Sequence, residues 1–198
     1  MNILKLCIIG LITVLLVACS RSKDTQMYLL NPLPPIKSAS QPYRHLQIGI
    51  DEINTPAYIE KPQLMIHYTP HRLELEEYHQ WAEALDKNIT RVIETNLSTL
   101  LPGSIVESSP WDSKFKPDYH LQIDISQFEI DINGNSMLRA EYLIYHGEEL
   151  IRKGNFYNCV KVIPAEMESL VVSMNNNLTY LTREIAKTFA AEYRAMSK

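Results

Sequence analysis

The spacing of apolar residues predicts two amphipathic helices in this chain. Between about Glu77 and Leu101, apolar residues recur at intervals of three and four, which places them on one face of a helix. The same spacing begins after Pro164 and continues to about Ala195, so this second helix would be about 45 Å long at 1.5 Å per residue. Asn175–Asn177 interrupt it with poor helix formers, and we expect a kink or fraying there.

Shorter segments alternate between apolar and polar residues and predict strands. Before the first helix, these segments are Met27–Leu30, Leu46–Ile50, Gln63–Tyr68 and Leu73–Glu76. Between the helices, the alternation runs from Leu121 to Val160, with turns at Asn133–Asn135 and His146–Gly147, which predicts an antiparallel meander. The alternation changes parity near Ser126–Gln127, so we expect a β-bulge there.

Together these elements predict an α+β fold. Residues 27–198 would form a single two-layer domain, in which a mixed, mostly antiparallel sheet packs against two main helices. The segment Thr55–Pro62 has a proline near each end and should form a rigid loop between two of the strands, because each proline ring fixes a backbone dihedral angle.

The first nineteen residues predict a lipid anchor. Lys5 precedes the apolar run Leu6–Leu16, which is followed by Val17-Ala18-Cys19, a pattern typical of a bacterial lipoprotein signal. A transmembrane helix fits less well, because the apolar run is shorter than the about 20 residues that cross a bilayer, and an ordinary cleaved signal peptide leaves the cysteine unexplained. We therefore predict a signal peptide over residues 1–18, acylation of Cys19 and a lipidated tether over residues 19–26.

The residue after Cys19 and the charge of the mature chain bear on location and partners. Ser20 follows the cysteine where an aspartate would favour retention in the inner membrane, so we expect an outer-membrane address that faces the periplasm. The whole chain has a net charge of −4, and loss of residues 1–18 removes only Lys5 among the charged residues, which leaves −5. Without a basic block, nucleic acid is not an expected partner, and the acyl chains must hold the protein on the membrane.

No pattern of catalytic or metal-binding residues stands out in the sequence. Six histidines are present, but Pro70 separates the two nearest, His67 and His71, which therefore do not share a helix face as metal ligands often do. Neither a nucleophile elbow nor a P-loop occurs. Acidic residues such as Glu129 are expected at the solvated surface, and Cys159, the only cysteine left after Cys7 is cleaved and Cys19 is acylated, is expected to be buried and inert. We therefore predict no enzyme activity, no cofactor and no metal.

Several segments resemble the auxiliary lipoproteins of ABC-type transport systems. The resemblance is sharpest at Pro56-Ala57-Tyr58-Ile59-Glu60-Lys61-Pro62-Gln63 and at Trp81-Ala82-Glu83-Ala84-Leu85, and it begins at Tyr28-Leu29-Leu30. The family favours a Pro-x-Tyr-Leu-Asp-Arg-Pro-Gln-like stretch and a Trp-Ala-Glu-Pro-Leu stretch, so Ala84 departs from the usual proline. The matching segments extend over nearly the whole mature chain.

The resemblance implies a part in lipid transport between the inner and outer membranes. The chain would be a non-catalytic outer-membrane subunit that docks a periplasm-spanning protein with mammalian-cell-entry domains, and self-association would be part of the same interaction role. Five residues are candidates for a docking or packing surface, namely Pro56, Tyr58, Pro62, Gln63 and Trp81. Two alternatives stay open: Tyr58 and Trp81 only pack the loop onto the first helix, or the protein is a periplasmic carrier that holds single lipids between sheet and helices.

Overall fold

The computed structural model describes residues 23–36 and 40–196 and confirms the predicted α+β fold. The predicted signal peptide, residues 1–18, and the predicted lipidation site Cys19 lie outside these residues. The strands are β1 Gln26–Tyr28, β2 Gln47–Asn54, β3 Gln63–Thr69, β4 Arg72–Trp81, β5 Ile105–Ser108, β6 Tyr119–Asp131, β7 Asn135–His146 and β8 Glu149–Lys161. The helices are the 3₁₀ turn η1 Ala57–Glu60 and the α-helices α2 Leu85–Leu100 and α3 Met167–Met196.

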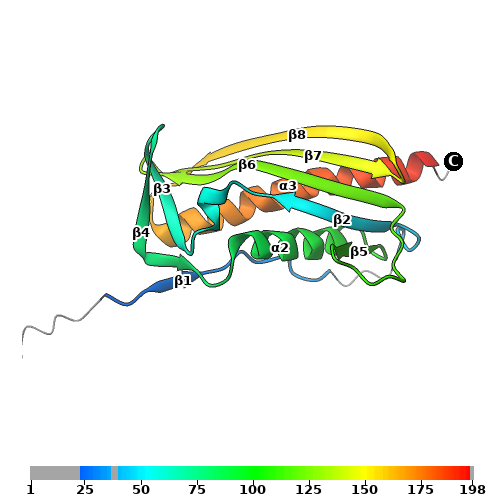
Figure 1. Cartoon of the computed structure of the whole chain (residues 1–198), viewed down its shortest axis with the longest axis horizontal. Helices are drawn as coiled ribbons and strands as arrows, with labels where there is room; N and C mark the ends of the chain where they lie inside the picture. Colours follow the sequence, from blue (N-terminus) through cyan, green and yellow to red (C-terminus); the bar gives the residue numbers. More distant parts are fainter. Residues whose placement is uncertain (1–22, 37–39, 197–198) are drawn as a thin grey trace, which may run out of the picture.

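Strand β6 organises the mixed sheet. It pairs with β7 in an antiparallel ladder along one edge, and β7 pairs with β8 in the same way, which confirms the predicted meander. On its other edge, β6 pairs in parallel with β2 over its first half and with β3 near its end. The η1 turn therefore connects two strands that lie one after the other along the same edge of β6 (Figure 1).

The predicted bulge occurs in β6 and decides which residues face the helices. The β6–β7 register shifts between Ile125 and Gln127. This shift keeps Ile125 and Phe128 on the buried face although they differ in parity, because the extra residue is absorbed locally. Beyond the bulge, Glu129 therefore points to the opposite face from Phe128.

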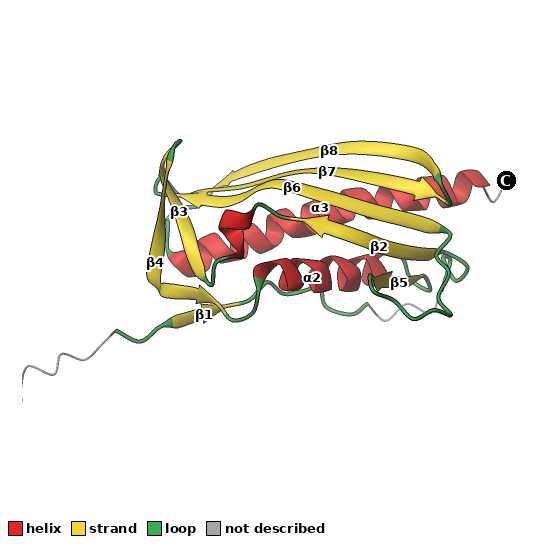
Figure 2. Ribbon diagram, in the orientation of Figure 1, coloured by secondary structure: helices red, strands yellow, loops and turns green. Residues whose placement is uncertain are grey.

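Helices α2 and α3 lie side by side under one face of the sheet (Figure 2). The apolar faces of both helices and the inward side chains of β2, β6 and β7 form one hydrophobic core. The opposite face of β6–β8 has no helix over it in the described chain, and β8 is the edge strand on that side. Cys159 on β8 is consequently exposed, which corrects the expectation that this thiol is buried.

The first helix begins later than predicted. Residues 77–81 belong to β4 rather than to a helix, and α2 starts at Leu85. The reason is a distant partner, because β1 pairs in parallel with this end of β4 and places Tyr28 opposite Trp81. The three- and four-residue spacing of the helix extends into this strand by coincidence, and local periodicity does not reveal a pairing with residues about 50 positions away.

The expected kink at Asn175–Asn177 does not occur, since α3 is a single helix of 30 residues. Two of these asparagines bond to other parts of the fold. The Asn175 side-chain oxygen accepts a hydrogen bond from the Asn31 backbone amide at 2.8 Å. Asn177 is fully buried, donates to the Ser136 carbonyl at 3.2 Å and accepts from Asn158 at 2.7 Å. These bonds offset the low helix propensity of asparagine.

Asparagine side chains also hold the proline-rich segment Leu29–Pro35, which we call the strap, against α2. Asn88 of α2 accepts a hydrogen bond from the Leu30 amide at 2.8 Å and donates to the Leu30 carbonyl at 3.0 Å. Asn96, about two turns further along the same face of α2, accepts from the Leu33 amide at 2.6 Å. The strap needs such partners because its prolines cannot donate to a sheet, and the buried asparagines supply them.

Candidate functional site

The segment Pro56–Gln63, which we call the proline-bounded loop, connects β2 to β3 and contains η1. Its first turn is closed by a hydrogen bond from the Ile59 amide to the Pro56 carbonyl at 3.0 Å, and the Ile59 side chain is buried. At the other end, the Pro62 carbonyl accepts a hydrogen bond from the Trp81 amide at 2.7 Å. The loop is therefore held to the core at both ends, as its two prolines predicted.

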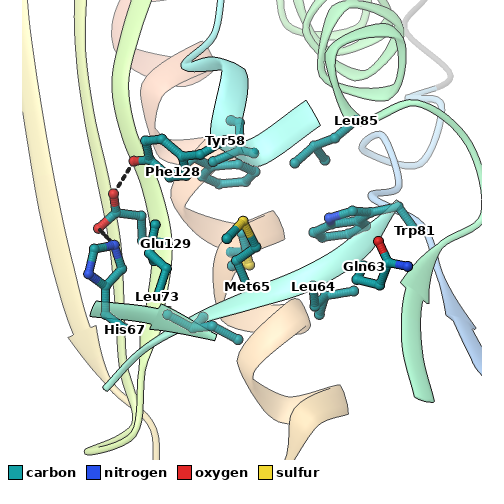
Figure 3. A pocket seen from close by; sticks show the side chains of 13 residues that line it. Tyr58, Gln63, Leu64, Met65, His67, Leu73, Trp81, Leu85, Phe128 and Glu129 are labelled. Carbon is teal, nitrogen blue, oxygen red and sulfur yellow. Dashed lines mark hydrogen bonds and ion pairs between the residues drawn. The ribbon is translucent and has the colours of Figure 1, made fainter. Parts of the chain in front are cut away.

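Three of the five candidate residues line one small pocket beneath this loop. Tyr58, Gln63 and Trp81 line the pocket together with Leu85 of α2 (Figure 3). Met174 of α3 is also among the lining residues. Pro56 and Pro62 are not among the lining residues and lie at the two ends of the loop. The structure thus brings together residues from β4, the loop and both helices.

The five candidates differ in how much surface they offer. Trp81 is only 7% exposed and its ring lies under the loop, as the packing alternative expects. Pro56, Tyr58 and Gln63 are half-buried, whereas Pro62 is exposed. The neighbouring loop residues Ala57, Glu60 and Lys61 are also exposed, so the outer surface of the loop consists of short or charged side chains supported from below by aromatic rings.

Sequence reasoning missed Glu129, which completes the site. This carboxylate is 6% exposed instead of solvated as expected, because the loop and β3 cover it. The Tyr58 hydroxyl donates a hydrogen bond to it. His67 Nε2 lies 2.9 Å from its second oxygen, within ion-pair distance but without hydrogen-bond geometry. The sequence carries no local signal for this burial, because Glu129 lies on the same outward face of β6 as Asp124 and is covered only by the distant loop and β3.

Burial and the bond to Glu129 define the state of Tyr58. Burial first, and then the hydrogen bond and the negative charge of Glu129, raise the pKa of the Tyr58 hydroxyl above its usual value. Tyr58 therefore remains protonated and donates its hydrogen to the carboxylate throughout the physiological range. This arrangement clamps the loop onto β6.

We expect Tyr58→Phe to lower the free energy of unfolding by about 1–3 kcal/mol, because a buried carboxylate loses its donor.

The contribution of Tyr58 to stability should also depend on pH in a defined direction. The folded-state pKa of Tyr58 is raised, so its contribution is complete below about pH 10, the pKa of an unperturbed tyrosine, and is lost as the pH rises above it. Chemical denaturation from pH 7 to 11 should show a shallower alkaline decline for Tyr58→Phe than for the unaltered protein. Parallel declines would contradict the clamp.

The pocket is too small for a lipid in this conformation. The space open to the centre of a water molecule is about 20 Å³, which accommodates about one water, whereas ligand pockets usually measure about 300–1,000 Å³. Among the described residues, no group of three or more His, Cys, Asp or Glu side chains is placed to hold a metal ion. The geometry of this pocket is therefore that of a supported loop, and the larger hollow of about 510 Å³ between β2 and α2 is lined mainly by charged and polar side chains such as Asp51, Lys87 and Glu94.

Comparison with known proteins identifies relatives over most of the chain. Residues 28–186 match the ABC-type transport auxiliary lipoprotein component family. The chain is 23% identical over 141 residues to the protein named "Intermembrane transport lipoprotein PqiC" from Escherichia coli (strain K12), which covers 70% of this chain and 73% of that protein. The protein of the same name from Shigella flexneri matches to the same extent.

Solved structures share the fold. Protein XCC0632 from Xanthomonas campestris superposes with a TM-score of 0.72 at 15% identity and covers 88% of this chain and 100% of that one. A crystal structure of an uncharacterized protein gives a TM-score of 0.71 at 20% identity, with 84% of this chain and 99% of the other covered. In the described part of the present chain, neither α-helix has the length and apolarity needed to cross a membrane.

Proposed function

Because the chain belongs to the ABC-type transport auxiliary lipoprotein family, we propose that it is the outer-membrane subunit of an intermembrane lipid-transport system. In this role it is anchored through acylated Cys19, faces the periplasm and docks a periplasm-spanning protein with mammalian-cell-entry domains. The family match over residues 28–186 carries the proposal, and the transport function in the name of the Escherichia coli relative supports it.

The small pocket favours docking over carriage. A carrier needs room for at least one acyl chain, and the space beneath the loop is that of about one water molecule. The pocket is instead filled by Trp81 and its neighbours, which hold the loop in place. Preorganisation of this kind increases affinity, because less conformational entropy is lost when a partner binds.

The outer surface of the proline-bounded loop is the docking surface in this proposal. Glu60, Lys61 and Pro62 are exposed there, and the Glu60 carboxylate accepts a hydrogen bond from Thr55 Oγ1 at 3.3 Å. The two opposite charges and the rigid proline offer polar, directional contacts around a fixed backbone. Tyr58 and Glu129 hold this surface against β6 from below.

Affinity purification after crosslinking in whole cells tests the proposal. The full acylated chain should recover a protein with mammalian-cell-entry domains, whereas Cys19→Ala, which cannot be acylated and so keeps its signal segment, should recover less of it and be missing from the outer-membrane fraction. Recovery of only peptidoglycan-binding or β-barrel-assembly proteins would overturn the proposal. Mass spectrometry of the amino-terminal peptide would report the acyl groups directly.

A further inference from the structure

The strand β1 and the adjoining part of β4 expose apolar side chains at the point where the amino-terminal tether enters the domain. Met27 is 60% exposed, Leu29 is 42% exposed and Tyr78 is 38% exposed. The Lys23 ammonium lies 5.2 Å from the centre of the Tyr78 ring. We call these four residues the β1–β4 patch.

The four side chains belong to one face. Tyr28 and His79 bond to each other at 2.8 Å on the opposite face, where burial, and then the negative charge of Glu168 near the start of α3, raise the pKa of the Tyr28 hydroxyl. Because side chains alternate along a strand, Met27 and Tyr78 point the other way, away from the helices. Exposure follows the same alternation into the strap, since Leu29 is exposed whereas Leu30 is fully buried.

The length of the tether limits how far this face can lie from the membrane. Cys19 and Lys23 are four residues apart, which is at most about 14 Å of extended chain. The headgroup layer beyond the hydrocarbon is itself about 5–8 Å thick on each side of a bilayer. Lys23, and the Tyr78 ring beside it, are therefore held within reach of the headgroups whenever Cys19 carries its acyl chains.

We propose that the β1–β4 patch rests on the membrane surface next to the lipid anchor and so fixes the orientation of the domain. This inference depends on the acylation of Cys19 proposed above. Methionine and leucine would enter the boundary between headgroups and acyl chains, while the tyrosine and the lysine stem would lie at headgroup level with their polar ends in water. The tether keeps the patch at a high local concentration beside the membrane, so a small apolar surface is sufficient for contact.

The charges around the patch favour a zwitterionic over an anionic lipid surface. Glu76 and Glu77 of β4 precede Tyr78, and Asp24 follows Lys23. The patch thus has no basic excess that would attract anionic headgroups. Contact by apolar insertion should occur on phosphatidylethanolamine and phosphatidylcholine and should not require anionic lipid.

The orientation has a consequence for the rest of the molecule. Figure 1 shows β1 and the β3–β4 hairpin at one end of the domain and the carboxyl terminus at the other. With β1 on the membrane, the long axis of α3 leads away from the bilayer. The face of the sheet that no described helix covers then points to the side, into the space above the membrane.

Tryptophan quenching by brominated lipids tests the contact. The full acylated protein, carrying either Met27→Trp or the control Tyr180→Trp, is placed in vesicles of phosphatidylethanolamine and phosphatidylcholine with or without bromine on the acyl chains. Tyr180 is an exposed aromatic residue on α3, thirteen residues or about 20 Å along the helix from Met167. The emission of Trp81 and Trp111, measured in the unaltered protein, is subtracted from both.

We expect a blue shift and a loss of emission from Met27→Trp in brominated vesicles, and no loss from Tyr180→Trp. Equal emission of Met27→Trp in both kinds of vesicle, in a protein shown by mass spectrometry to be acylated, would overturn the membrane contact and leave the lipid anchor intact. Absence of acyl groups on Cys19 would overturn both. Quenching that appears only after phosphatidylglycerol is added would contradict the assignment to a zwitterionic surface.

Discussion

Trp81→Ala should lower the free energy of unfolding by about 3–5 kcal/mol, the cost of deleting a large buried aromatic side chain. Trp81 is 7% exposed and contributes to the pocket between the loop and the two helices. Its loss enlarges that small space into a cavity lined by Leu85 and Met174, and the surrounding helices cannot close it without losing their own contacts. Equilibrium unfolding in urea measures the change.

Pro62→Ala is the matched control for Trp81. Pro62 lies beside Trp81 through the hydrogen bond of its carbonyl, which the substitution preserves, but its side chain is exposed. Its loss should change stability by less than about 1 kcal/mol. If Trp81→Ala instead left stability unchanged and abolished partner capture, Trp81 would be a docking residue and the packing described above would be wrong.

Asn88→Ala should cost about 2–4 kcal/mol in the free energy of unfolding. The Asn88 side chain satisfies both the amide and the carbonyl of Leu30, a residue with no exposed surface. Each buried backbone group that is left without a partner costs about 1–3 kcal/mol. The strap should loosen before the rest of the domain, so hydrogen exchange at the Leu30 amide should accelerate even under native conditions.

Thr95→Ala on the same helix serves as the control for Asn88→Ala. Thr95 is exposed, and its hydroxyl bonds only back to the Arg91 carbonyl, so its loss should change stability by no more than about 0.5 kcal/mol. Similar values for the two variants would show that the asparagine does not hold the strap. The comparison also separates this tertiary role from any general effect on the helix.

The sequence predicted those features that local periodicity encodes. The meander, the bulge near Gln127 and the length of α3 follow from alternation and from a three- and four-residue stripe. Strand β5 was missed because only four residues, Ile105–Ser108, form it, and its partner β2 lies more than 50 positions earlier in the chain. The start of α2 was wrong for the same reason, since the partner of Trp81 is Tyr28.

The candidate site was predicted only in part, for physical reasons that concern burial. The motif residues Tyr58, Gln63 and Trp81 do converge on one pocket. Glu129 was expected in solvent because a carboxylate on an alternating strand is usually solvated. Its burial depends on a loop that arrives from another part of the chain. The role of Asn177 likewise depends on distant residues, because its partners Ser136 and Asn158 lie on β7 and β8.

Site-specific photocrosslinking from the proline-bounded loop tests the central claim most directly. The photoreactive amino acid p-benzoylphenylalanine replaces exposed Pro62 in the full chain and, as a control, exposed Tyr180 on α3. Irradiation of whole cells should yield a covalent adduct between position 62 and a protein with mammalian-cell-entry domains, and no such adduct from position 180. An adduct from position 180 with none from position 62 would contradict the assignment of the loop as the docking surface.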